Sequence, residues 1–303
     1  MTKKTKQALV TIIIPAFSHE QYVEQALLSA IRQDYENLEI IVIDDGSTDG
    51  TAAVIEDVLA RSCNHRDVKF IRQPNQGLSR TLNKGLEMAG GEFVHILASD
   101  DAYLPAKTSV CVNRLSALPE SVGAIYCDGY VVDEDNNKLM KFSERFPRPF
   151  SSNTHKELLV GNWIPAMGLF YRKKALLAAG GYDESIQVED WELLLRLTRS
   201  FRVLSIPDLL FLYRSHASNY SNDRVRMLSQ QDAIAKKYDE LRCFIGFIES
   251  IRGRSIAGAV RNLSFLNCEL TARAILRHLR KLYWRRRVSR RADGGSAPTL
   301  LSE

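Results

Sequence analysis

The chain has 303 residues, of which 45% are hydrophobic and 25% charged. It is therefore too long for a small disulfide-stapled domain and too apolar for a disordered chain. Five scattered cysteines lack the Cys-x-x-Cys spacing of a zinc or redox site, which indicates reduced thiols in the cytosol. No apolar run approaches the roughly 20 residues that span a bilayer. We expect a cytoplasmic protein without a signal peptide or a membrane-spanning helix.

The net charge of +5 is unevenly distributed along the chain. Residues 1–235 hold 26 Lys and Arg against 30 Asp and Glu, whereas residues 236–303 hold 15 against 6. A basic tail on an acidic body predicts an anionic partner for the tail only, such as lipid headgroups or nucleic acid. A solvated helix face would have the same composition.

The first hundred residues alternate short β-branched runs with amphipathic stretches. The run 38–43 is almost continuously apolar, as expected when helices cover both faces of a parallel sheet. Capping and stop residues mark the helix ends: Asp49 or Thr51, Ser79, Pro105, and the pair Gly90-Gly91. We predict an open, mostly parallel α/β sheet with strands at 10–14, 38–43, 68–72 and 93–97, and helices at 22–33, 51–61 and 78–89.

After Pro119 the regular alternation ends and an extension of the same sheet is expected. Strands are predicted at 122–126, 130–132 and 202–206, a polar connector at 133–153, and helices at 189–199, 225–251 and 256–287. The resulting domain prediction is an α/β domain over 8–222, a basic helical extension over 223–291 and a disordered tail over 292–303.

Paired carboxylates follow two of the predicted strands, at the sheet edge where open α/β folds bind ligands. One strand continues as Asp44-Asp45-Gly46-Ser47-Thr48-Asp49 and another as Ser99-Asp100-Asp101. Several carboxylates at one edge repel each other unless a cation lies between them, and a divalent metal with a nucleotide diphosphate meets that condition. Taken alone, the first loop is also explained by ordinary turn and cap residues.

Two other phosphate-binding devices are absent from the sequence. The first strand continues as Pro15-Ala16-Phe17-Ser18 without Gly-x-Gly-x-x-Gly, and there is no Gly-x-x-x-x-Gly-Lys-Ser/Thr. The sequence therefore disfavours NAD, FAD and P-loop NTPase chemistry. A diphosphate would need a metal, and Asp100 and Asp101 could supply its ligands.

The order of these blocks resembles the GT-A fold of family 2 glycosyltransferases, over about residues 8–220. A single block is weak evidence of a relationship, but seven blocks in the right order are strong evidence. The similar blocks are Pro15-Ala16-Phe17-Ser18, Ser29-Ala30-Ile31-Arg32-Gln33-Asp34-Tyr35, Ile43-Asp44-Asp45-Gly46-Ser47-Thr48-Asp49, Asn75-Gln76-Gly77-Leu78-Ser79, Ser99-Asp100-Asp101, Gly180-Gly181-Tyr182-Asp183-Glu184 with Glu189-Asp190-Trp191, and Tyr213-Arg214-x-His216.

The resemblance implies a role for individual residues. Pro15, Ala16 and Phe17 would line the base pocket, Asp45 would accept a base N–H, expected from uracil, and Asn75 and Asp100 would contact the donor. Asp101 would hold Mg²⁺ or Mn²⁺, Asp190 would be the general base, and His216 would reach the metal, or else be a loop histidine without a ligand role. Glu189-Asp190 could equally be an acidic first helical turn favoured by the helix dipole.

The resemblance also implies the reaction: inverting transfer of one sugar from a UDP-sugar to a glycan or lipid-linked acceptor. The absence of Gln-x-x-Arg-Trp after Asp190 disfavours a processive synthase. Phe17-Ser18, Leu82 and Ala98 depart from the family pattern. Two alternatives remain, a non-catalytic relative that binds nucleotide-sugar and a sugar-phosphate nucleotidylyltransferase, although the glycine-rich first loop of the latter is absent.

The segment 256–287 carries an apolar stripe flanked by arginines and ends near Tyr283 and Trp284. This composition suits a helix lying in a membrane surface, close to a lipid-linked acceptor. An amphipathic helix docked on the catalytic domain or on a second subunit would look the same. Because the basic excess is confined to the tail, we expect no nucleic-acid partner.

Overall fold

The structure is a computed structural model that describes residues 7–62, 66–146, 154–159, 161–219 and 222–238. The chain divides into two units, Met1–Ile234 and Ala235–Glu303. The first part of the helix expected at 225–251 is observed as α9 (Arg224–Lys237), and residues 239–251 lie outside the described residues. The predicted helix 256–287 and tail 292–303 lie outside the described residues. Within the described residues, no helix is long and apolar enough to cross a bilayer.

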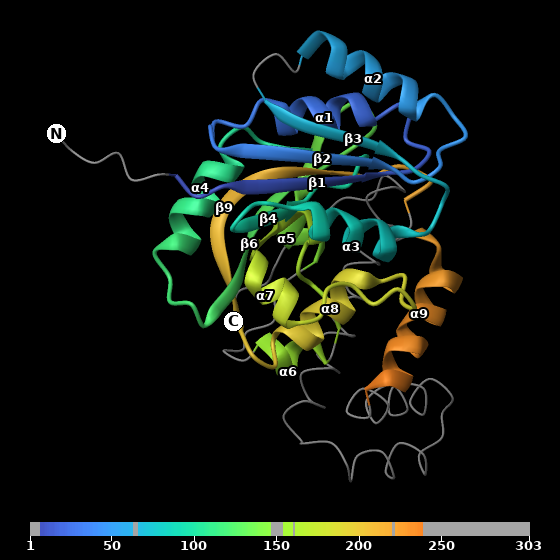
Figure 1. Ribbon diagram of the computed structural model, residues 1–303. Coiled ribbons are helices and arrows are strands. Elements are labelled where there is room, and N and C mark those ends of the chain that lie inside the picture. Colours follow the sequence, from blue (N-terminus) through green and yellow to red (C-terminus); the bar gives the residue numbers. More distant parts are fainter. Residues whose placement is uncertain (1–6, 63–65, 147–153, 160, 220–221, 239–303) are drawn as a thin grey trace, which may run out of the picture. The chain divides into compact units, whose positions relative to one another are not determined.

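The first half of unit 1 is a parallel sheet in the order β3-β2-β1-β4 (Figure 1). All seven residues of β2 are buried, as its apolar sequence predicts. The predicted elements are confirmed, with ends differing by at most two residues: β1 (Val10–Ala16), α1 (Val23–Ile31), β2 (Leu38–Asp44), α2 (Thr51–Ser62), β3 (Asp67–Arg72), α3 (Leu78–Met88) and β4 (Phe93–Ile96).

Helices cover both faces of this parallel half, with α1 and α2 on one face and α3 on the other (Figure 1). Side chains alternate along β1: Ile12 and Ile14 belong to the core that contains Leu27 of α1 and Ile55 of α2. Ile13 instead lies against α3 at Gly85. The strand is therefore apolar at consecutive positions because each face has its own helical layer.

The second half extends the sheet as β4-β8-β6-β9-β5, with β7 paired to β6. Strand β8 is antiparallel to both β4 and β6, so β6 and its parallel partner β9 run in the same direction as β1. The elements are β5 (Ala102–Tyr103), α4 (Lys107–Ser116), β6 (Val122–Val132), β7 (Lys138–Lys141), α5 (Phe142–Arg145), α6 (Thr154–Leu158), η1 (Ala166–Gly168), β8 (Leu169–Arg172), α7 (Lys173–Ala178), α8 (Glu189–Leu197) and β9 (Arg202–Arg214).

Three features of this half differ from the sequence prediction. The two strands expected at 122–126 and 130–132 form one strand, β6, and β9 extends beyond 206 to Arg214. At Gly129 the two strands approach closely, because a Cβ there would lie 2.4 Å from the Phe211 ring. The connector expected at 133–153 contains β7 and α5; β7 is largely exposed, and pairing with β6 rather than a buried face holds it.

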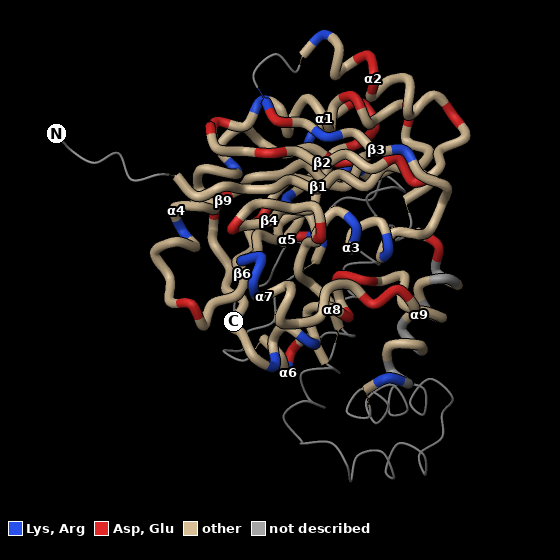
Figure 2. The backbone as a smooth tube through the Cα atoms, in the orientation of Figure 1, with Lys and Arg blue, Asp and Glu red and all other residues tan. Residues whose placement is uncertain are grey.

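Charged residues of both signs are interspersed along the described elements in the view of Figure 2. This pattern agrees with the nearly balanced counts for residues 1–235, 26 basic and 30 acidic. The basic excess of the chain therefore belongs to residues 236–303.

Candidate active site

The carboxyl ends of β1, β2, β4 and β9 meet at one edge of the sheet, because these strands share one direction. The loops that follow them carry His19, the Asp44–Asp49 carboxylates, Asp100-Asp101 and His216. The topology thus brings residues from both halves of unit 1 to the edge where open α/β sheets bind ligands.

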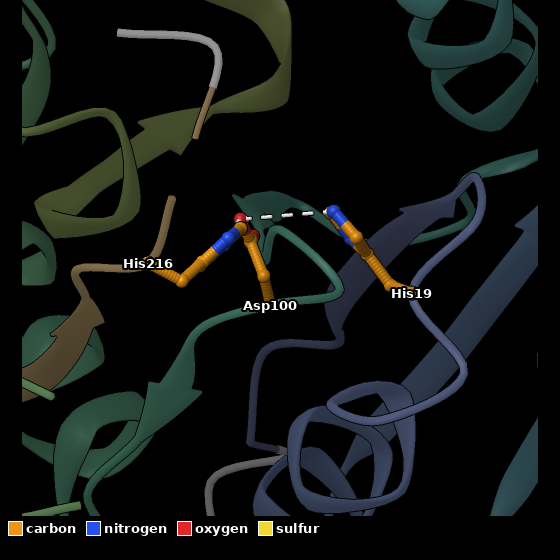
Figure 3. A group of neighbouring side chains, drawn as sticks. All are labelled: His19, Asp100 and His216. Carbon is orange, nitrogen blue, oxygen red and sulfur yellow. Dashed lines mark hydrogen bonds and ion pairs between the residues drawn. The ribbon is translucent and has the colours of Figure 1, made fainter. Parts of the chain in front are cut away.

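His19, Asp100 and His216 form a compact group at this edge (Figure 3). The Nε2 atom of His216 lies 3.1 Å from Asp100 Oδ2, and Nε2 of His19 lies 3.9 Å from the same oxygen. One ligand atom from each residue falls within 4.8 Å of the others. Two imidazole nitrogens and a carboxylate oxygen at these distances fit a divalent cation.

The other ring nitrogen of each histidine is held by a serine hydroxyl. Nδ1 of His19 lies 2.8 Å from Ser99 Oγ, and Nδ1 of His216 lies 2.8 Å from Ser218 Oγ. Such contacts fix the orientation of an imidazole, as is usual around metal ligands. Both Nε2 atoms consequently face Asp100.

The electrostatic environment keeps Asp100 ionised. Burial opposes its charge, but the hydrogen bond with His216 and the electrostatic interaction with His19 outweigh burial and lower the pKa of Asp100. Burial lowers the pKa of His19, while Asp100 acts in the opposite direction. An ionised carboxylate beside a neutral imidazole is the protonation state that metal binding requires.

Asp101, expected from the resemblance to hold the metal, lies outside this group. Its Oδ1 accepts the backbone N–H of Arg214 at 2.8 Å, and the residue is only 2% exposed. Burial and the neighbouring Asp100 charge raise the pKa of Asp101 well above its ordinary value. In this structure Asp100, rather than Asp101, faces the two histidines, because the backbone of β9 engages the Asp101 carboxylate. The metal role expected for Asp101 stays a prediction.

Arg214, at the end of β9, ties the loop that carries Asp100 to the rest of the edge. Its Nε donates to the carbonyl of Asp100 at 2.9 Å, and its Nη1 donates to the carbonyl of Glu134 at 2.9 Å. The guanidinium also lies 5.1 Å from the ring centroid of Tyr22. Arg214 is 2% exposed, so this buried cation positions Asp100 without facing solvent.

Asp45 organises the loop that follows β3. Its carboxylate accepts Gln73 Nε2 at 2.8 Å and the backbone N–H groups of Gln76 and Gly77, each at 2.9 Å. The neighbouring Gly46 has φ +79°, and a Cβ there would lie 2.6 Å from the backbone nitrogen of Asn75. The two loops consequently pack against each other, and protein donors already engage the carboxylate expected to accept a base N–H.

The residues expected to line the base pocket differ in exposure. Ala16 is 1% exposed, Pro15 is half-buried, and Phe17 is 47% exposed. Asn75 is also exposed, and its Oδ1 accepts the Gly77 N–H at 3.2 Å. Of these four residues, Phe17 offers the large apolar surface on which a base could stack.

Asp190 lies in the first turn of α8 in a separate group of contacts. Its Oδ2 accepts Asn162 Nδ2 at 2.9 Å, and its Oδ1 accepts the Trp191 backbone N–H at 2.7 Å. Burial raises the pKa of Asp190 to about 6. Burial and the Asp190 charge also raise the pKa of Glu189. The bond to Trp191 is that of a helix-start carboxylate, whereas the raised pKa suits a base working near neutral pH.

Sequence reasoning missed His19 and the part played by Arg214. His19 follows β1 at the same edge as Asp100, so its place after a strand was a usable signal. The signal for Arg214 was weaker, because a buried arginine at a strand end is recognised only when its partners are known.

Comparisons with known proteins point to one family. The profile of the family described as glycosyl transferase family 2 matches residues 11–178. The chain is 28% identical over 241 residues to an uncharacterized glycosyltransferase of Rickettsia typhi, covering 77% of this chain and 72% of that protein. It is also 28% identical over 191 residues to a chondroitin synthase of Escherichia coli, covering 63% of this chain but only 26% of the synthase.

Two solved structures share the fold at low sequence identity. Residues 1–349 of TarS from S. aureus, in complex with UDP-GlcNAc, match with a TM-score of 0.59 and 19% identity over 75% of this chain and 65% of that one. The mannosyltransferase PcManGT from Pyrobaculum calidifontis, in complex with GDP-Man and Mn²⁺, matches with a TM-score of 0.58 and 18% identity over 92% and 88%. Because the family profile spans more than half of the chain, the protein belongs to glycosyl transferase family 2 and has the GT-A fold.

Proposed function

We propose that the protein transfers a single sugar from a nucleotide-sugar, expected to be a UDP-sugar, to a hydroxyl of a glycan or lipid-linked acceptor. The observation that carries this proposal is the convergence of Asp100 and His216 at the carboxyl edge of a family 2 fold. These two residues would hold Mg²⁺ or Mn²⁺. The bound cation supplies neutralisation of the charge that develops on the departing diphosphate.

The donor would lie between Asp100 and His216 on one side and the loops after β1 and β3 on the other. Phe17 presents an apolar surface for the base, and Asp45 shapes the pocket by fixing the backbone at Gln76 and Gly77. The bound nucleotide-sugars of TarS and PcManGT, which share this fold, support a nucleotide-sugar donor.

Asp190 is the proposed general base. Asn162 and the Trp191 N–H hold its two oxygens in place, and the raised pKa strengthens its affinity for the proton of an acceptor hydroxyl. Removal of that proton as the acceptor attacks the sugar gives direct, inverting displacement. A non-catalytic relative that only binds nucleotide-sugar is the second candidate, since Asp190 could serve α8 alone.

The test is a screen of nucleotide-sugars for binding and turnover with Mg²⁺, Mn²⁺ or chelator. Asp100→Asn should lower donor affinity and turnover together. Asp190→Asn should leave donor affinity within about threefold while transfer falls at least about 100-fold, the usual scale of lost proton-transfer catalysis. Asp57→Asn, an exposed carboxylate on α2, is the matched control and should change neither.

Equally tight donor binding in chelator would refute the metal role. Transfer retained by Asp190→Asn would reassign this residue to the helix start. Donor binding without turnover of any nucleotide-sugar, even with a range of acceptors, would favour the non-catalytic candidate.

A further inference from the structure

The loop that carries His19 is held in place by its own backbone contacts. The Ser18 N–H donates to Ser47 Oγ at 2.9 Å, and the His19 N–H donates to Thr51 Oγ1 at 2.8 Å. Ser18 has φ +53°, a left-handed conformation that a non-glycine residue adopts when its surroundings impose it. His19 is therefore presented to the sheet edge by a fixed turn.

The imidazole of His19 points toward Asp100 and His216 and remains accessible to solvent. Its Nδ1 bonds Ser99, the residue before Asp100, so the ring is tied to the same loop as the carboxylate. Side-chain exposure is 25% for His19, 15% for Asp100 and 1% for His216. Figure 3 shows His19 and His216 approaching Asp100 from opposite sides. The two ring planes are inclined at 88°, and the ring centroids lie 6.0 Å apart.

The ligand types decide which cation such a group prefers. Mg²⁺ favours oxygen ligands, keeps several waters and is usually held by one or two carboxylates plus substrate phosphates. Imidazole nitrogens suit transition metals, and two histidines with one carboxylate leave open positions for further ligands. Asp100 and His216 alone would depend on donor phosphates to complete the site, whereas a third protein ligand would allow the free protein to bind the ion.

We propose that His19 is the third metal ligand and that the resulting group of two histidines and one carboxylate binds Mn²⁺ before the donor, in preference to Mg²⁺. This inference rests on the proposed function, because it adds a ligand and an order of binding to the same site. The nucleotide-sugar then meets a site that already carries the positive charge for its diphosphate.

The experiment titrates the full chain, without nucleotide, with Mn²⁺ followed by electron paramagnetic resonance, and with Mg²⁺ as competitor. We expect wild-type protein to bind Mn²⁺ at least about tenfold more tightly than Mg²⁺. His19→Gln should lose at least about tenfold in Mn²⁺ affinity, since even outer-shell changes lose 10- to 100-fold. His155→Gln is the matched control, because Nδ1 of His155 likewise lies 2.8 Å from a hydroxyl, that of Thr198, and its Mn²⁺ affinity should be unchanged.

A direct readout is the nitrogen hyperfine coupling of bound Mn²⁺, which reports coordinated imidazole. The signal should decrease in His19→Gln and persist in His155→Gln, and melting curves of the metal-free variants establish that both are folded. Mn²⁺ binding that requires nucleotide diphosphate, or an unchanged affinity or nitrogen coupling in His19→Gln, would overturn the inference. The proposed function would survive that result if donor binding stays metal-dependent and is lost in Asp100→Asn, and would fail with it if Asp100→Asn binds donor normally.

Discussion

Replacing Arg214 by methionine tests whether one buried guanidinium holds the loop that carries Asp100 in place. The variant loses hydrogen bonds to the carbonyls of Asp100, Asp133 and Glu134 and to the side chains of Gln25 and Asn136. Methionine has no donor to replace them. The backbone N–H of residue 214 still reaches Asp101, so the change isolates the guanidinium.

The magnitude follows from which acceptors water can reach after the substitution. Glu134 and Asn136 are exposed, so water can replace the lost donor there. The bond to the Asp133 carbonyl is long, at 3.2 Å, and contributes little. The Asp100 carbonyl and Gln25 lie deeper, and hydrogen bonds from a charged donor are each worth about 1.5–3 kcal/mol. Counting these two hydrogen bonds at the lower end of that range predicts that the free energy of unfolding falls by about 3 kcal/mol. For a unit of this size, that loss lowers the melting temperature by about 6–12 °C.

Arg61→Met is the matched control, because Arg61 makes ionic hydrogen bonds of 2.6 and 2.8 Å to Glu24 and Asp57 but is about half exposed. Exposed pairs of this kind contribute little, so its melting temperature should stay within about 2 °C of wild type. Circular dichroism melts of both variants measure the difference, and Mn²⁺ titration should show weaker binding in Arg214→Met alone. If the two variants have the same melting temperature, burial is not what makes Arg214 important, and the reasoning fails.

The remaining predictions concern the donor loop, the base and the basic segment. Asp45→Asn places an amide against the N–H groups of Gln76 and Gly77; UDP affinity, measured by calorimetry with Mn²⁺, should fall about 10- to 100-fold, and an unchanged affinity would separate Asp45 from the pocket. Because only ionised Asp190 accepts a proton and burial raises its pKa to about 6, kcat should fall as the pH drops below about 6; a midpoint near 4 would contradict its buried environment. We also propose that the segment 256–287 contacts anionic membranes, so replacing Arg285, Arg286 and Arg287 by glutamine should weaken sedimentation with anionic vesicles by about 1 kcal/mol per residue, and equal partitioning would argue for docking on protein.

The parallel half of the sheet could be predicted because each element carries its own signal. The run 38–43 is apolar at nearly every position, and Asp49 accepts the Thr51 N–H at 3.1 Å at the start of α2, as its position before the helix suggested. Strands β7 and β8 have four residues each. Strand β7 is a short, largely exposed hairpin partner of the end of β6, and β8 is held by strands distant in sequence, so local pattern does not reveal either one.

The sequence indicated which loops form the site, but not the direction in which each side chain points. Asp100 and Asp101 were found because they follow a strand at the ligand edge. The backbone N–H of Arg214, 113 residues after Asp101, determines which of the two carboxylates faces His19 and His216. Adjacent aspartates look equivalent in sequence, and only the docking of β9 distinguishes them.

The parallel pairing of β9 with β6 also sets a time at which the site can exist. Contacts across more than a hundred residues form late in folding, because loop closure must precede any gain from the contact. At about 5–20 residues per second, synthesis reaches residue 214 about 6–23 s after residue 101. A nascent chain whose first β-α units have already folded therefore still lacks Arg214, which anchors the loop that carries Asp100. Under the proposed function, binding of the cation and of the donor would require the completed sheet, and a half-synthesised chain would not bind nucleotide-sugar.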